Sequence, residues 1–231
     1  MALVLLPGGE QRSGSIGSTV YSRNRFGQYI RARAIPVNPN TTRQATIRAF
    51  MSYLTEYWQS SLTQAQRDAW DVYGLNVNMS TQPWSYKYLT GFQQFNRSNI
   101  PRLQAALAQV DDGPVVFNKA YTETSLSATA SEATQQLTVA FNDQGGWVGT
   151  DETGLLIQVG KPVNGGIKFF GGPFRYADVV KGDGAAAPTS PATITSPWPI
   201  AEGQRLWIQA RITLEDGRLS DFARYDFLCA A

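Results

Sequence analysis

The spacing of hydrophobic residues changes at the turn-forming run 111–114 of this chain of 231 residues, and that change limits the folds open to it. Between 41 and 108, hydrophobic residues recur every three or four positions, as on one side of an amphipathic helix. After that run they recur at every second position in short stretches separated by Gly, Pro, Asn and Asp, which is typical of strands. We therefore predict an α+β chain with a flexible or extended arm at 1–17, a hairpin and helical module at 18–113, and an antiparallel β-sandwich at 114–231.

The first module opens with a predicted β-hairpin at 18–36, followed by helices. Two β-prone runs flank a tight connection near Gly27, where glycine can supply the positive φ that such a turn needs. Ser/Thr followed three residues later by Gln is the spacing of a helix capping box, and it occurs at Thr41 and again at Thr63. The pattern predicts helices at 41–61, from Thr63 to about Gly74, and at 86–108, the last with a kink or break at Pro101.

Large aromatic side chains recur at helical spacing, and we expect them to form the core of a small three-helix bundle rather than a ligand site. The aromatic residues in this set are Phe50, Tyr57, Trp58, Trp70 and Tyr73.

The second module reads as about seven short strands, which favours a β-sandwich. The clearest alternation is at 205–214, and 215–218 supplies a hairpin turn before the final strand. The segment 185–199 contains four prolines, so we expect it to be a surface excursion or an edge rather than a central strand. Other predicted strands include 125–130, 137–141, 155–159 and 222–228.

The chain contains no histidine, which removes the commonest general base, the Ser-His-Asp and Cys-His pairs, and the usual zinc sites. The single cysteine, Cys229, has no such base to activate it. Two acidic pairs, Asp111/Asp112 and Asp151/Glu152, fall in glycine-flanked stretches that predict solvated loops. We therefore expect no enzymatic activity, no metal and no cofactor. The sequence also contains no run of about 20 apolar residues that could span a membrane.

Basic character is local. The formal net charge is only +2, yet residues 1–60 contain seven Arg and two Glu with no Lys or Asp. Arginines in the hairpin are expected to form one arginine face that docks on an acidic surface of a partner protein, because the guanidinium binds carboxylates through two hydrogen bonds. A solvated strand face stays open as an alternative, and nucleic acid is the least favoured partner. The predicted docking residues are Tyr21, Arg23, Arg25, Tyr29, Arg31 and Arg33.

Aromatic residues near turns of the second module allow two interpretations. Trp147, Trp198 and the phenylalanines of 169–174 could stack on sugar rings if they are exposed. We favour the alternative, in which they cover the open ends of the sandwich.

Two resemblances follow from these segments. The runs at 203–211 and 215–220 resemble the last two strands and connecting turn of a fibronectin type III-like or Ig-like domain, and that resemblance covers 120–228. The N-terminal part resembles a group of tailed-phage virion-associated proteins over 14–108. The stretches that carry the second resemblance are 21–33, 36–39, 62–70, 89–97 and 101–103.

These resemblances imply a non-enzymatic structural protein located in a virion that assembles in the host cytoplasm. The favoured role is a capsid decoration or cement protein that docks through its N-terminal module. The implied partners are major capsid or tail proteins and other copies of the chain. A tail or neck component, or a carbohydrate-binding adhesin module, remains the alternative.

Overall fold

The computed structural model describes residues 2–3, 13–24, 27–80 and 86–231. It is an α+β arrangement with three helices and several antiparallel sheets. Its contacts divide the chain into a small unit, Met1–Ala45, and a larger compact unit, Thr46–Ala231. The predicted hairpin and helical module is therefore split, because the hairpin belongs to the small unit and the helices belong to the larger one.

The small unit is one antiparallel sheet in the order β1-β4-β3-β2. Its central pair is the predicted hairpin, which runs in register from Thr19↔Ala32 to Asn24↔Gly27, with Gly27 at φ +123°. Part of the expected arm is also extended, since it supplies β1 and β2. The four strands are β1 (Ala2–Leu3), β2 (Gly14–Ile16), β3 (Thr19–Asn24) and β4 (Gly27–Ala32).

Three helices begin the larger unit: α1 (Thr42–Ser60), α2 (Gln64–Asn76) and α3 (Gly91–Gln104). The two predicted capping boxes are confirmed. The Thr63 side chain accepts from the Gln66 N–H at 3.3 Å, and the Thr41 hydroxyl accepts from the Gln44 N–H at 3.4 Å. None of the helices within the described ranges is long and apolar enough to cross a membrane.

The third helix differs from its predicted bounds of 86–108. It begins at Gly91 because Thr90 caps it, with its hydroxyl accepting from the Gln93 N–H. Pro101 lies inside α3, so no new helix begins there, and the helix ends at Gln104, with Ala106 at φ +50° two residues later.

The helices enclose a core of buried apolar residues. Trp70 and Phe95 are both fully buried, and their ring centroids lie 5.7 Å apart in an edge-on arrangement. Trp58 is partly buried and packs against the same Phe95 at 5.3 Å. The core assignment is thus confirmed for Trp70 and Tyr73, which are buried, and for Tyr57 and Trp58, which pack against them, whereas Phe50 lies outside this core. The buried residues of the core are Leu54, Leu62, Trp70, Tyr73, Val77 and Phe95.

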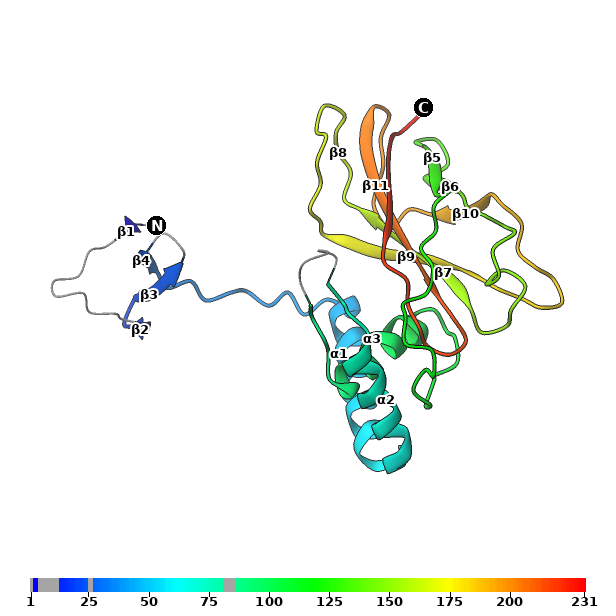
Figure 1. Cartoon of the computed structure of the whole chain (residues 1–231). Coiled ribbons are helices and arrows are strands. Elements are labelled where there is room, and N and C mark those ends of the chain that lie inside the picture. The colour runs from blue at the N-terminus through cyan, green and yellow to red at the C-terminus, as the bar shows by residue number, and fades with distance from the viewer. Residues whose placement is uncertain (1, 4–12, 25–26, 81–85) are drawn as a thin grey trace. The chain divides into compact units, whose positions relative to one another are not determined.

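Two antiparallel sheets make up the rest of the larger unit, in the orders β10-β6-β5 and β12-β11-β7-β9, with β8 pairing β11. In Figure 1 the helices gather at one end of these strands. The predicted edge character of 185–199 is confirmed, because β10 pairs only with β6. The strands are β5 (Ser127–Ser131), β6 (Gln136–Ala140), β7 (Gly154–Gly160), β8 (Val163–Asn164), β9 (Phe174–Lys181), β10 (Ala192–Thr195), β11 (Gln204–Thr213) and β12 (Ala223–Leu228).

Residues from both sheets share one hydrophobic core. Strand β11 shows why: Leu206, Ile208, Ala210 and Ile212 alternate along it, and all four are fully buried in that core. β11 is the longest strand and pairs with both β7 and β12, so its inward face anchors the larger sheet.

The segment 111–114, predicted to separate two domains, is packed against α2. The Trp70 indole N–H donates to the Asp111 carbonyl oxygen at 2.9 Å. A Cβ on Gly113 would lie 2.6 Å from the Trp70 backbone nitrogen, so only glycine fits there without a shift. The segment therefore joins the helices to the sheets as one compact unit instead of acting as a linker.

Replacing Trp70 by Ala is expected to lower the free energy of unfolding by about 3–5 kcal/mol, because it empties the centre of the helical core. Thermal unfolding should show a midpoint lower by about 10 °C. The Phe169→Ala variant is the control, since Phe169 is 81% exposed, and its midpoint should move by less than about 2 °C. Equal midpoints for the two variants would contradict the core assignment.

Candidate docking surfaces

Acidic side chains of the larger unit hold its loops together. The Glu152 carboxylate accepts from the Ala108 N–H at 2.6 Å, and Asp151 accepts from the Gly184 N–H at 2.8 Å. Asp111 accepts from the Tyr57 hydroxyl at 2.9 Å. Within the described residues, no three acidic or cysteine side chains are grouped so that they could hold a metal ion. Each of these acids therefore has a structural role, because it accepts a hydrogen bond from a backbone amide or from a tyrosine hydroxyl.

The thiol of Cys229 is buried. Burial raises its pKa, with Glu132 and Glu202 adding to the shift, and a thiol with a raised pKa is a poor nucleophile.

The register of the hairpin divides the predicted docking residues between two faces of its sheet. Residues directly opposite each other in an antiparallel pair point to the same side, and neighbours along a strand alternate. Tyr29 pairs with Ser22 and Arg31 pairs with Val20, so Tyr29 and Arg31 share one face. Tyr21 and Arg23 lie on the opposite face. The expected single arginine face is therefore corrected to two smaller ones.

These residues differ in exposure as well. Arg23, Arg31 and Arg33 are exposed, whereas Tyr21 and Tyr29 are partly buried. Arg33 follows the end of β4, and its backbone N–H donates to the Ser18 carbonyl oxygen at 2.8 Å, which extends the pairing by one residue. Arg25 lies outside the described residues. Arg31 and Arg33 are two positions apart at the end of β4, so their exposed side chains project on the same side of the sheet.

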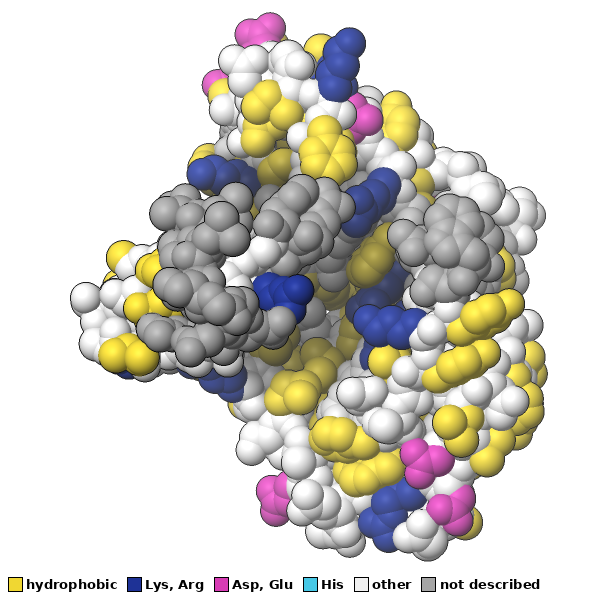
Figure 2. Space-filling view, turned by 60° about the vertical axis from the view of Figure 1, so that its left-hand side comes forward, with side chains coloured by type: hydrophobic (Ala, Val, Ile, Leu, Met, Phe, Trp, Pro, Cys, Tyr) yellow, Lys and Arg dark blue, Asp and Glu magenta, His cyan; other side chains and the backbone are white. Residues whose placement is uncertain are grey.

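Residues 33–41, between the hairpin and α1, are all exposed. Two of them are large and apolar: Ile35 is 82% exposed and Val37 is 89% exposed. Pro36 and Pro39 cannot donate backbone hydrogen bonds, and they favour an extended backbone. Figure 2 shows hydrophobic side chains reaching the surface at several places. Apolar side chains in so open a segment are suited to burial against another protein.

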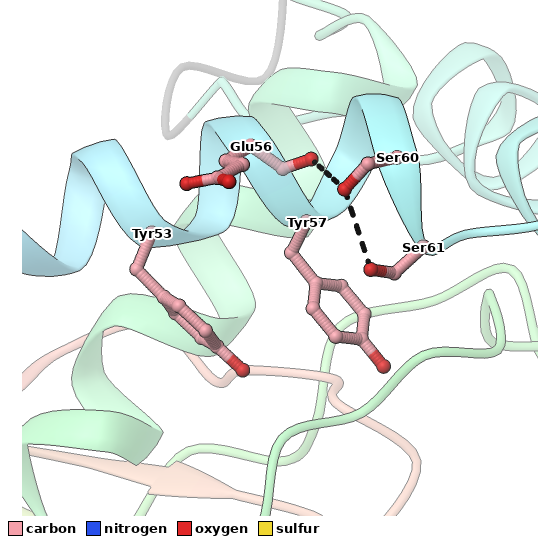
Figure 3. Close-up of a pocket in the computed structure, with 5 residues that line it drawn as sticks. All are labelled: Tyr53, Glu56, Tyr57, Ser60 and Ser61. Carbon is pink, nitrogen blue, oxygen red and sulfur yellow. Dashed lines mark hydrogen bonds between the residues drawn. The ribbon is translucent and has the colours of Figure 1, made fainter.

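A small pocket on α1 was not anticipated from the sequence. Its lining residues are Tyr53, Glu56, Tyr57, Ser60 and Ser61 (Figure 3). The two phenol rings point to the same side of α1 with centroids 5.8 Å apart, and Ser60 donates to the Glu56 carbonyl oxygen at 2.8 Å. The hydrogen bond to Asp111 raises the pKa of Tyr57. The sequence contains one signal for this pocket, which is the spacing of Tyr53 and Tyr57 four residues apart in a predicted helix.

The aromatic residues of the larger unit mostly cover one another. Trp147 is 1% exposed and packs on Phe141. Trp207 is 7% exposed and is stacked under Phe170, with ring centroids 5.4 Å apart. A Cβ on Gly160 would lie 2.5 Å from the Phe170 ring, so this glycine leaves room for the stack.

Trp198 is partly buried in the shared core, and the Arg175 guanidinium lies 3.4 Å from the centre of its ring. Of the aromatic residues considered for sugar binding, Phe169 is the one that is largely exposed. The others are buried or partly buried, and their covering of the open ends of a sandwich stays a prediction.

The sequence matches no protein-family model and no curated protein.

The Gly160→Ala variant should displace Phe170 from Trp207, because the added methyl group would overlap the ring. We expect stronger acrylamide quenching of tryptophan fluorescence and a loss of about 1–3 kcal/mol in the free energy of unfolding. Gly146→Ala is the matched control, because a Cβ at Gly146 would have no atom within 4 Å. If Gly160→Ala and Gly146→Ala behave alike, Phe170 does not depend on this contact.

Proposed function

We propose that this protein is a non-enzymatic structural component of a tailed-phage virion, and that it docks on its neighbours through the N-terminal hairpin. The observation that supports the proposal is a small sheet with exposed arginines that belongs to a unit of its own and is followed in the chain by nine exposed residues at 33–41. Proteins that act by docking need surface of this kind, with arginine for charge pairing and apolar side chains to bury.

The face that bears Tyr29 and Arg31 is the better candidate for the docking surface. Arg33 extends the alternation beyond the end of β4, so this side presents two exposed guanidinium groups and one partly buried ring. Tyrosine and arginine are both enriched at protein interfaces. The opposite face offers Arg23 beside Ile30 and Ala32, and it therefore presents less charge.

We also propose that the two sheets of the larger unit form a fibronectin type III-like or Ig-like sandwich. The strand order supports this. We count the strands of the larger unit in chain order and leave out the two-residue β8. The first, second and fifth (β5, β6, β10) then form one sheet, and the third, sixth and seventh (β7, β11, β12) form the other, as in Ig-type domains. The fourth, β9, pairs with β7 and so extends the second sheet. Such a domain can project from a shell or bridge to a neighbour.

Within the virion, the favoured location is the capsid exterior, where the protein would act as decoration or cement between major capsid proteins. A tail or neck component is the alternative. Imaging of intact virions would decide between them, because a decoration protein repeats with the capsid lattice whereas a neck or tail component follows the tail symmetry. Purified virions that lack the chain altogether would refute the proposal.

A carbohydrate-binding adhesin is a second candidate, and one observation favours it. Phe169 is 81% exposed at a pocket that Lys168, Arg224 and Asp226 also line, so an apolar ring lies beside charged groups. Glycan binding that Phe169→Ala abolishes would support this role.

The double variant Arg31→Ala/Arg33→Ala is expected to weaken binding to virions stripped of this protein by tenfold or more, because it removes two guanidinium groups from the docking face. Co-sedimentation measures the bound fraction. Arg23→Ala is the matched control, since it removes an exposed arginine from the opposite face, and it should change binding less than threefold. Equal losses in both variants would indicate a general charge effect.

A further inference from the structure

The outer face of β11 carries polar side chains between residues of the main core. Gln209, Arg211 and Thr213 alternate with the fully buried Ala210 and Ile212. Thr213 is paired, because its hydroxyl accepts from Arg102 at 3.3 Å. Arg211 is not, since its buried Nε has no hydrogen-bond partner within the described part of the chain. Its guanidinium carbon lies 4.8 Å from the centre of the Phe222 ring, which covers one side.

A second arginine approaches from α3. Arg102 fixes the end of α3 to the end of β11, donating to the Leu214 carbonyl oxygen at 2.8 Å as well as to Thr213. Arg97 lies five residues earlier on that helix and makes no hydrogen bond or ion pair with the residues that the structure describes. Burial lowers the pKa of Arg97. Arg97 and Arg211 stand on the two elements that the Arg102–Thr213 hydrogen bond joins, and Arg211 lies two residues before Thr213 on the same face of β11. Burial lowers the pKa of Arg211 to about 10, and the charge of Arg97 adds to that shift.

The charge of Asp221 raises the pKa of Arg97, but this carboxylate is already paired with a lysine. Both carboxylate oxygens of Asp221 accept from the Lys119 ammonium at 2.9 Å. Arg102 shows the contrast, because it bonds two carbonyl oxygens, one hydroxyl and the Glu152 carboxylate. A partly buried guanidinium without such partners is costly, so Arg97 and Arg211 would gain from an added anion.

Two amide side chains beside these arginines also have unused hydrogen-bonding atoms. Gln94 lies one helical turn before Arg97 and is fully buried, and neither polar atom of its side chain has a described partner. Gln209 precedes Arg211 on the same strand face. Its amide nitrogen donates to Gln158 at 2.7 Å, while its buried oxygen is unpaired. The Gln94 amide can donate to an anion alongside the guanidinium groups.

We propose that Arg97 and Arg211 form a binding site for the carboxylate of an acidic side chain on a partner protein. A carboxylate fits because the Nε edge of a guanidinium offers two parallel N–H groups to its two oxygens. Both arginines are partly exposed, and Phe222 beside Arg211 is 38% exposed, so a side chain from outside can reach them. The proposal deepens the docking function by placing a second contact on the larger unit, and it rests on residues that the hairpin variants leave unchanged.

The test uses the full chain and follows its thermal midpoint at constant ionic strength. The probes are blocked Ala-Glu-Ala, its Gln counterpart, sodium acetate and sodium phosphate, each against sodium chloride. We expect the Glu peptide to raise the midpoint by about 2–4 °C at about five times its Kd, and the Gln peptide to have no effect. Each variant is compared with itself without probe, so a change in its basal stability does not affect the result.

Arg211→Met and Arg97→Met should each abolish the rise. Lys161→Met is the control, because it removes an exposed cation just beyond the end of β7, five residues past the Leu156 that pairs with Arg211, and it should keep the rise. An equal rise in all variants, or none in the unchanged chain, overturns the site. A larger rise with phosphate, or a rise with acetate but not with the Glu peptide, overturns the assignment to a partner's acidic side chain. These measurements need no virion, so they fail separately from the docking proposal.

Discussion

The buried guanidinium of Arg102 joins the helices to the strands, and the larger unit depends on it. Its side chain is 1% exposed, and its donors meet the Ala108 and Leu214 carbonyl oxygens, the Thr213 hydroxyl and the Glu152 carboxylate. A buried charge is tolerated only when its hydrogen bonds are made. The end of α3, the turn that follows it and the end of β11 must therefore come together for any of them to be stable.

That requirement explains why the helices do not form a separate module. Gly113 lies against the backbone of α2, and the Trp70 indole bonds the carbonyl group of Asp111, so the connection between helices and sheets is itself packed. The hairpin belongs to the other unit, Met1–Ala45. The small sheet carries exposed arginines, and this is the basis of the proposed virion role.

Much of the local structure was predictable because it depends on residues close together in the chain. Thr41 and Thr63 cap helices where their spacing to Gln indicates, and the alternation at 205–214 gives the central strand β11. Other predictions failed where a local pattern continued beyond a boundary. Tyr88 and Phe92 keep a helical rhythm across Thr90, yet the capping hydroxyl of Thr90 starts α3 at Gly91. Strand β9 went unrecognised, and its burial does not alternate regularly, because its pairing with β7 shifts register between Ile157 and Gln158.

The sequence by itself determined the change of period, the caps, the turn at Gly27 and the absence of any imidazole, all of which follow from local spacing or composition. Only the tertiary structure decided which arginines share a surface. Register across β3 and β4 separates Arg23 from Arg31, and among the residues that the structure describes Arg97 on α3 and Arg211 on β11 have no acidic hydrogen-bond partner. The physical reason is that pairing and burial depend on residues far apart in the chain, whose contacts no local pattern records.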